Sequence, residues 1–277
     1  MKAQVFPKVP TAIKLFTTGA TVGPIVDSLH NQCLLEYDRA PISLAWPAFL
    51  HPLASPATVD HIISSNILAT NSPYFLCTSW LVPPLLGFAY VVLGAILPNI
   101  ISVLISQFEE EQNRFSKFKA QFNDRKPSTP EFLKTRAIQA VISTAFIIKL
   151  SELLQTNSLP IPATSHQESL NLVLMVFAAL SQWALLDKSL ISLLVATITA
   201  IGGPLSEIPF VASGCWHYIP EAANYFPLQT FSNLFPLNNL PADLALSDIT
   251  GPCYFAVTMD AIALGRWYDS MRKEKND

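Results

Sequence analysis

The stretch NRFSKFKAQFNDRKPSTPEFLKTR, residues 113–136, lies between two long apolar segments and holds seven of the chain's 17 lysine and arginine residues. A connection this rich in basic residues is typical of a loop on the cytosolic side of a membrane protein. Most of the other basic residues fall in the N-terminal stretch, in one short connection and at the C-terminal end. These are Lys2, Lys8, Lys14, Lys188, Arg266, Arg272, Lys273 and Lys275.

The remaining connections between apolar segments lack basic residues almost entirely. They lie near residues 36–72, 155–168 and 213–247, and Arg39 is the single basic residue in all three. Alternation of basic and non-basic connections is the positive-inside pattern of a multi-spanning membrane protein. The sequence therefore predicts six spans, with both termini in the cytosol.

The composition agrees with a membrane protein. Half of the residues, 51%, are hydrophobic and only 13% are charged, whereas soluble domains carry roughly 25% charged residues. The formal net charge of -3 gives no reason to expect a nucleic-acid partner. Lys14 interrupts the first apolar run, so we expect no cleavable signal peptide, and the first span would act as an uncleaved insertion signal.

We expect one all-α domain covering residues 1–277, a polytopic bundle of six transmembrane helices. A helix needs about 20 mostly apolar residues to cross the hydrocarbon layer. This length places the spans near 13–33, 80–105, 134–154, 168–186, 189–211 and 249–268. The long loops 36–72 and 213–247 would lie on the non-cytosolic side, and the Pro-rich second loop would lie in water or at the interface, because irregular backbone is not tolerated in lipid.

Ionisable residues inside predicted spans are candidate functional groups. Asp27 and His30 are three residues apart and share a helix face, so they could form a relay or bind a polar headgroup; an interfacial or helix-joining role is the plainer alternative. Asp260 is the deepest acid. Lys149 could snorkel or pair with an acid, and Glu152 and Glu207 lie at span ends. Together these residues do not form a convincing proton relay.

The cysteine and histidine patterns indicate no metal or cofactor. The four cysteines are predicted on or near the non-cytosolic side, where disulfides and buried thiols are both open interpretations. No CxxC, HExxH or other ligand spacing is present, and the chain lacks phosphate-binding and nucleophile motifs. We therefore expect no catalytic residue, no cofactor and no metal. The cysteines are Cys33, Cys77, Cys215 and Cys253.

Two short features suggest sorting and partner contact. Lys273 and Lys275 lie near a predicted cytosolic C-terminus, which matches a dilysine signal for retrieval to the endoplasmic reticulum; such signals are receptor-read addresses. Asp187 lies in the short turn before the fifth span. It could cap that helix by accepting amide hydrogen bonds, or it could contact a partner protein.

Three collinear motifs resemble the Insig family. WLVPP at residues 80–84, followed by Gly87, resembles the tryptophan and double-proline opening of the second Insig span. WALLDKS at 183–189 resembles the turn between Insig spans four and five. GPCYF at 251–255, with Gly265-Arg266 and a basic tail, resembles the last Insig span. The resemblance covers roughly residues 13–35 and 73–275.

The resemblance implies a non-catalytic protein of the endoplasmic reticulum membrane. Insig proteins bind an oxysterol, or a diacylglycerol-type lipid in bacterial relatives, and retain sterol-sensing membrane proteins of the escort-protein or reductase type. Carried over by position, Asp187 would be needed for partner binding. Trp80, Pro83, Pro84 and Gly87 would shape the lipid-binding or partner-binding surface.

This sequence also departs from the animal pattern. Leu81 stands where a second tryptophan is usual, Lys188 replaces an arginine, and both non-cytosolic loops are longer. Two other classes of function remain open. One is a small-solute transporter or membrane enzyme that uses Asp27, His30 and Asp260. The other is a membrane assembly factor without a lipid ligand.

Overall fold

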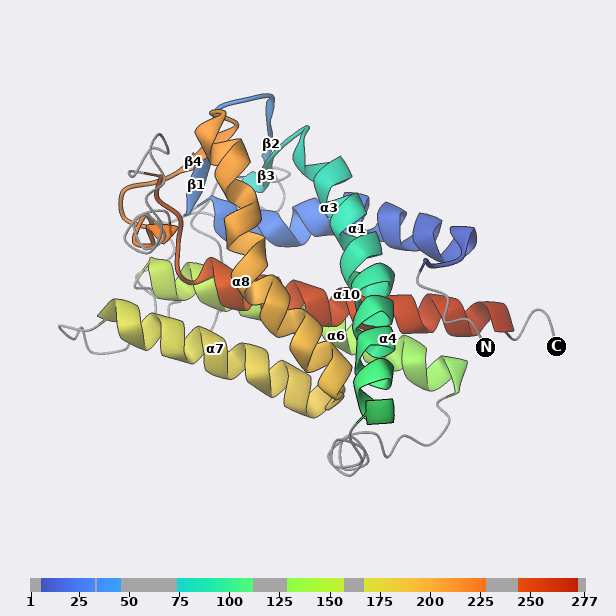
Figure 1. Cartoon of the computed structure of the whole chain (residues 1–277). Helices are drawn as coiled ribbons and strands as arrows, with labels where there is room; N and C mark the ends of the chain where they lie inside the picture. Colours follow the sequence, from blue (N-terminus) through green and yellow to red (C-terminus); the bar gives the residue numbers. More distant parts are fainter. Residues whose placement is uncertain are drawn as a thin grey trace, which may run out of the picture.

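The computed structural model describes residues 6–32, 34–45, 74–111, 129–156, 167–227 and 244–273. In this part of the chain, helices occupy the positions of all six predicted spans (Figure 1). The second span is one continuous helical run of three labelled parts. The elements are α1 (Val9–Asn31), α3 (Val82–Val91), η3 (Val92–Ile96), α4 (Leu97–Glu111), α6 (Pro130–Gln155), α7 (Gln167–Leu186), α8 (Leu190–Ala212) and α10 (Thr250–Lys273).

Two small antiparallel ribbons join the bundle at one end, and the all-α prediction missed them. Strand β1 (Leu35–Tyr37) pairs with β4 (Trp216–Tyr218), and β2 (Pro41–Ala45) pairs with β3 (Tyr74–Ser79). Strands of three to six residues carry too little periodicity to be read from sequence. The first ribbon also connects segments about 180 residues apart, so the two predicted non-cytosolic loops meet each other there.

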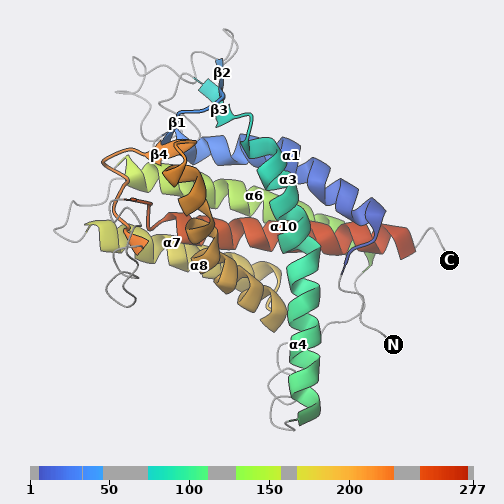
Figure 2. The same ribbon diagram turned by 45° about the horizontal axis from the view of Figure 1, so that its top comes forward.

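Helix α10 is the centre of the bundle. It contacts α6, α8, α7, α1, α3 and η3, and other helices cross it on both sides (Figures 1 and 2). Its first half is buried on nearly every face, including Ala256, Met259 and Ala261. A helix with no lipid-facing side does not need a uniformly apolar surface, which explains why α10 includes Asp260 and Arg266.

Two glycines allow η3 and α10 to cross closely. A Cβ on Gly265 would collide with the carbonyl oxygen of Gly94, and a Cβ on Gly94 would lie 2.5 Å from the carbonyl oxygen of Ala261. Gly94 lies in η3, a π-helical segment whose wider turn interrupts the α-helix. The crossing of η3 and α10 therefore requires both residues to lack side chains. Beyond the crossing, α4 extends away from the other helices (Figure 2).

Four helical segments in the described part of the chain are long and apolar enough to cross a membrane. They are Val82–Gln107, Pro130–Gln155, Gln167–Leu186 and Leu190–Ala212. Helices α1 and α10 occupy predicted spans but do not meet this criterion, since α1 is rich in threonine and α10 is the polar central helix. Membrane crossing by these two helices, and cytosolic placement of the termini, remain predictions.

Residues from the predicted basic segments meet at one end of the bundle. Lys14 of α1 lies over the ring of Tyr268, near the end of α10, with its Nζ 5.5 Å from the ring centroid. Arg136, near the start of α6, donates a hydrogen bond to the carbonyl oxygen of Leu185 at 3.0 Å. The strands lie at the other end. Lys14 and Arg136, from two segments that are predicted to be cytosolic, therefore lie at the same end of the bundle.

Candidate functional site: a clasped turn and an apolar groove

The connection between α7 and α8 is a tightly determined turn. The amides of Asp187 and Lys188 both donate to the carbonyl oxygen of Trp183, at 3.0 and 2.9 Å. Lys188 has φ of 61°, a left-handed conformation that usually favours glycine because of its missing Cβ. A lysine held in this conformation indicates that contacts around the turn fix its shape.

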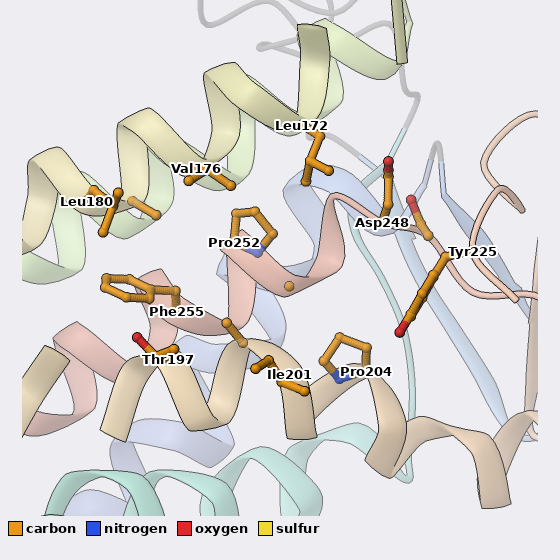
Figure 3. A pocket seen from close by; sticks show the side chains of 14 residues that line it. Leu172, Val176, Leu180, Thr197, Ile201, Pro204, Tyr225, Asp248, Pro252 and Phe255 are labelled. Carbon is orange, nitrogen blue, oxygen red and sulfur yellow. The ribbon is translucent and has the colours of Figure 1, made fainter. Parts of the chain in front are cut away.

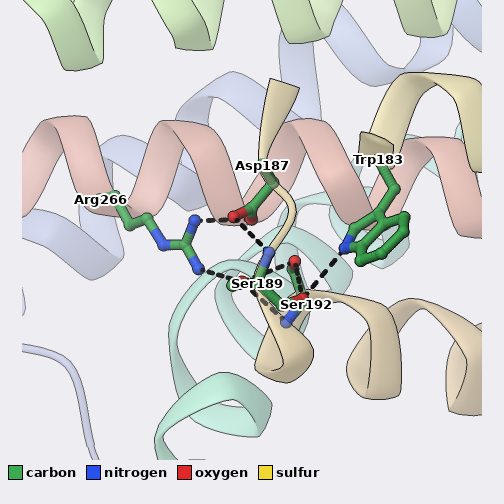
Figure 4. Close-up of polar contacts among 5 residues, drawn as sticks. All are labelled: Trp183, Asp187, Ser189, Ser192 and Arg266. Atoms are coloured by element: carbon green, nitrogen blue, oxygen red, sulfur yellow. Dashed lines mark hydrogen bonds and ion pairs between the residues drawn. The ribbon is translucent and has the colours of Figure 1, made fainter. Parts of the chain in front are cut away.

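Asp187 and Arg266 form the main contact that fixes the turn (Figure 4). Arg266 Nη1 donates to Asp187 Oδ2 at 2.6 Å, and Arg266 Nη2 donates to Ser189 Oγ at 3.2 Å. The Asp187 side chain is 6% exposed and that of Arg266 is 31% exposed. Trp183 Nε1 completes the arrangement by donating to the carbonyl oxygen of Ser189 at 3.0 Å. We call these four residues the clasp.

The capping role predicted for Asp187 belongs to Ser189 instead. Ser189 is the N-cap residue of α8, and its Oγ accepts a hydrogen bond from the amide of Ser192 at 3.3 Å. Asp187 accepts from the amide of Ser189 at 3.3 Å, one step before the helix. Asp187 therefore accepts an amide hydrogen bond, as the capping interpretation expected, but the N-cap position of α8 itself is at Ser189.

A groove of about 510 Å³ lies between α7, α8 and α10. Its walls are mostly apolar. Tyr225 and Asp248 lie at one end of the groove, and Thr197 lies at the other end beside Phe255 (Figure 3). Val176, Leu180 and Ile201 line the groove and are also exposed, so it opens on the bundle surface. Other apolar lining residues are Leu172, Pro204, Pro252 and Phe255.

A smaller cavity of about 130 Å³ brings Asp27 and Glu207 together. Glu207 accepts hydrogen bonds from Tyr218 at 2.7 Å and from Tyr254 at 2.8 Å. Tyr218 lies in β4, outside the predicted spans. Burial, followed by the nearby charge of Glu207, raises the pKa of its phenol well above 10.0, so Tyr218 stays a hydrogen-bond donor at neutral pH.

Asp27 has close neighbours of its own. Asn31 Nδ2 lies against Asp27 Oδ2, and the hydroxyl of Tyr37 donates to the same oxygen at 3.3 Å. Burial also raises the pKa of Tyr37 well above 10.0. Asp27 is thus a fixed hydrogen-bond acceptor at the strand end of α1.

The three residues of the transporter hypothesis do not form one visible site. Asp260 is 1% exposed and accepts a hydrogen bond from Tyr90 at 3.2 Å, and it does not line the cavity that contains Asp27. The side chain of His30 lies outside the described residues. Lys149 forms a buried ion pair with Glu152 at 2.6 Å, which is one of the two roles predicted for that lysine.

The residues singled out by the family motifs lie at opposite ends of the bundle. Trp80 precedes α3 at the strand end and is 69% exposed, while Pro83 and Pro84 form the first turn of α3. Gly87 faces α1, where an added Cβ would lie 2.8 Å from a ring atom of Phe16. Asp187 is at the far end, so the structure does not bring it together with the other four.

The structure describes only some of the residues of the predicted sorting signal and only some of the cysteines. The side chain of Lys273 and all of Lys275 lie outside the described residues. Cys77 and Cys215 are free thiols near the strand end, Cys253 lies in the first turn of α10, and Cys33 lies outside the described residues. Within the ranges that the structure describes, no group of three or more His, Cys, Asp or Glu residues could hold a metal ion.

The sequence did not reveal the residues that complete the clasp and the polar end of the groove. Arg266 stood out in the sequence as part of the basic C-terminal end and of the Gly265-Arg266 motif, but not as the residue that binds Asp187. The opposite charges of Asp187 and Arg266 were the one hint of this contact in the sequence. Nothing in the sequence indicated that two residues 79 positions apart would meet. Tyr225, Ser247 and Asp248 form the polar end of the groove, and their segment was read only as an interfacial loop.

These features define an α-helical membrane protein with a buried central helix. The family model of insulin-induced protein (INSIG) matches residues 11–232 of the chain. The chain therefore belongs to the INSIG family, and membership indicates a regulatory or adaptor role in a membrane.

The fold is also similar to a solved structure. The crystal structure of the cross-linked MvINS trimer matches with a TM-score of 0.51 and 16% sequence identity, and the match covers 98% of each chain. At this identity the likeness supports the fold alone. No curated protein matches the sequence.

Proposed function

We propose that this protein is a non-catalytic adaptor of the endoplasmic reticulum membrane that binds a sterol or diacylglycerol-like lipid and retains sterol-sensing membrane proteins. INSIG family membership supports the adaptor role. The observation that carries the lipid-binding part is the apolar groove between α7, α8 and α10. Its volume of about 510 Å³ falls in the range of roughly 300–1,000 Å³ typical of small-molecule sites.

The position of the groove supports entry from the bilayer. Val176, Leu180 and Ile201 line the groove and are exposed, and Val173 and Phe177 of α7 are exposed as well. A lipid in the membrane can reach such an opening without crossing water. Its apolar body would replace acyl chains against the helices, and its polar head would lie at the strand end.

The clasp supports the partner-binding part of the proposal. Asp187 is held inside the protein by Arg266, so we assign it a positioning role rather than direct partner contact. It fixes the turn that presents two exposed residues, Leu185 and Lys188. A partner helix would contact the surface around this turn.

The groove and the clasp both involve α7, α8 and α10. A ligand in the groove could therefore change the affinity of the turn for a partner. Leu180 and Asp187 are seven residues apart in the sequence, about 10 Å along the α7 axis. A ligand between α7 and α10 would favour one spacing of these helices, and Arg266 of α10 would transmit that spacing to the turn. The ligand shifts partner affinity only by its own differential affinity for the two spacings, and the effect is reciprocal.

Lipid binding to the purified full-length protein in detergent tests this function. We expect saturable binding of a tritiated oxysterol or a labelled diacylglycerol, competed by the same unlabelled lipid. Saturable binding of neither lipid would remove the lipid-sensing role and leave a lipid-independent assembly factor. Flux or turnover that disappears in a folded variant with Asp27, His30 and Asp260 all changed to Ala would support the transporter or enzyme class instead.

A further inference from the structure

The two ribbons at the strand end of the bundle differ in charge. In the β1–β4 ribbon and the residue after β1, His217 Nδ1 lies 2.9 Å from Asp38 Oδ2, and its Nε2 lies 3.9 Å from Glu36 Oε2. All three side chains are exposed. Strands β2, PISLA, and β3, YFLCTS, contain no Asp, Glu, Lys, Arg or His. Because charged groups are costly to remove from water, the two ribbons suit different surroundings.

The uncharged β2–β3 ribbon exposes apolar side chains. Leu44 and Leu76 are partners in the strand register, so they share one face of the ribbon. Leu44 is exposed, and so are Tyr74 at one end of the ribbon and Trp80 just beyond the other. Trp80 is 69% exposed. An uncharged surface with several large exposed apolar groups is typical of a contact with a membrane or a protein.

The chain fixes this ribbon close to a bilayer surface. Strand β3 ends at Ser79, and the apolar segment long enough to cross a membrane begins at Val82. The two residues between them, Trp80 and Leu81, extend over at most about 7 Å. The ribbon therefore begins where this span leaves the hydrocarbon layer.

Hydrogen bonds place the ribbon beside the last turn of α1. The amide of Cys77 donates to Ser28 Oγ at 3.2 Å, and Gln32 Nε2 donates to the carbonyl oxygen of Tyr74 at 3.1 Å. Ser28 lies three residues before Asn31, the last residue of α1, which is about 4.5 Å along the helix axis. In Figures 1 and 2 the ribbon lies to the side of α1, near the start of α3. Its depth is thus that of a helix end, not of a loop in bulk water.

An exposed stripe of α3 leads directly to Trp80. Trp80, Pro84 and Phe88 are all exposed, and they follow one another at the four-residue spacing of a single helix face. Phe88 lies inside the membrane-crossing segment Val82–Gln107, where an exposed phenylalanine faces lipid. The exposed surface at Trp80 is therefore continuous with the lipid-facing surface of that span.

We propose that the β2–β3 ribbon is an interfacial anchor. It lies in the headgroup layer of the non-cytosolic leaflet, with Leu44, Tyr74 and Trp80 in contact with lipid, while the β1–β4 ribbon lies in water. Tryptophan and tyrosine suit this layer because their rings are apolar and carry a polar group. Paired strands are tolerated there, since amides outside the pairing still reach water or headgroups. The anchor is independent of the proposed lipid-sensing function.

Quenching of tryptophan fluorescence tests the anchor. The full-length protein in phosphatidylcholine nanodiscs is compared with Trp80→Phe, and the difference between the two is the emission of Trp80. We expect lipids brominated on the acyl carbons nearest the headgroup to quench this emission strongly, and aqueous iodide to quench it weakly. Strong quenching by iodide alone, or quenching by neither, would overturn the anchor, because Trp80 would then lie in water or under a protein surface.

Two matched variants compare the ribbons directly. In the Trp80→Phe background, Leu44→Trp places the probe on the uncharged ribbon and Glu36→Trp places it on the charged one, each at an exposed strand position. Brominated lipid should quench the Leu44→Trp emission roughly twofold more than that of Glu36→Trp, and iodide should show the reverse order. If Trp80→Phe fails to fold, the same two substitutions in the unmodified chain give the comparison. Equal quenching of the two ribbons would contradict the anchor.

Discussion

Arg266 and Asp187 are 79 residues apart in the sequence and form an ion pair of 2.6 Å that joins the α7–α8 turn to the last third of α10. The pair lies where predicted basic segments converge, and hydrogen bonds to Ser189 extend it on both sides. A polar contact between a short turn and the central helix fixes the position of both. Replacing Asp187 would therefore change the conformation of the whole turn. It would not simply remove one carboxylate from the surface.

Breaking the clasp should destabilise the protein from either side. Asp187→Ala leaves Arg266 without its carboxylate and should lower the free energy of unfolding by about 3 kcal/mol, the size expected when one partner of a largely buried pair is removed. Arg266→Ala should cost a similar amount, and the double variant should cost much less than the sum. Thermal unfolding in detergent measures all three. Additive effects would show that the two residues act independently.

Partner capture should follow the same pattern. We expect Asp187→Ala and Arg266→Ala to lose membrane-partner crosslinking together, because both release the turn. Lys134→Ala changes a basic residue of α6 outside the clasp and serves as the control. If Arg266→Ala were folded and captured partners normally while Asp187→Ala did not, Asp187 would contact the partner directly.

A substitution at Lys188, the left-handed residue of the turn, should raise stability instead of lowering it. Lys188 has φ of 61°, so Lys188→Gly should raise stability by about 1 kcal/mol through relief of backbone strain. Lys188→Val should lower stability, because a β-branched residue tolerates this conformation poorly. A lower unfolding temperature for Lys188→Gly would mean that the lysine side chain itself supports the turn.

The crossing of η3 and α10 should be intolerant of a single methyl group. Gly265→Ala places a Cβ against the carbonyl oxygen of Gly94, so we expect a loss of about 2 kcal/mol or more from overpacking. Gly202→Ala is the matched control, since nothing lies within 4 Å of its added Cβ. In α8 that change should gain up to about 1 kcal/mol of helix propensity. Equal stability of the two variants would contradict the crossing.

A surface contact between the ribbon strands should respond to pH. His217 Nδ1 lies 2.9 Å from Asp38 Oδ2, and this hydrogen bond raises the pKa of the histidine above 6.5. Because the pKa is raised in the folded state, the contribution to stability is complete at acidic pH and is lost as pH rises through that pKa. Melting curves from pH 5.5 to 8.5 should show this loss in the unmodified protein and not in His217→Gln.

Long apolar segments made the helices predictable from the sequence. Each predicted span coincides with a helix, since hydropathy over about 20 residues is a strong signal and basic connections mark alternate ends. Helix α10 shows the limit of hydropathy, because its burial depends on neighbours and not on its own composition. The ribbon of Leu35–Tyr37 with Trp216–Tyr218 had no local signal at all.

Sites were harder to predict than helices, because each site depends on residues that are far apart in the sequence. Asp187 was identified through a family motif, but its partner Arg266 and the cap at Ser189 emerge only when the turn meets α10. Tyr225 and Asp248 are far apart in the sequence, and nothing in the sequence indicates that both line one groove. Only the folded chain brings them to the same groove.

The most direct test of the central claim is a crosslinking pull-down of the intact, tagged protein from membranes, with and without added sterol. We expect sterol to increase capture of a membrane partner by the unmodified chain, and Asp187→Ala to abolish this increase. Capture that is the same with and without sterol, in a preparation that binds sterol saturably, would contradict the claim that this protein couples a lipid to a partner.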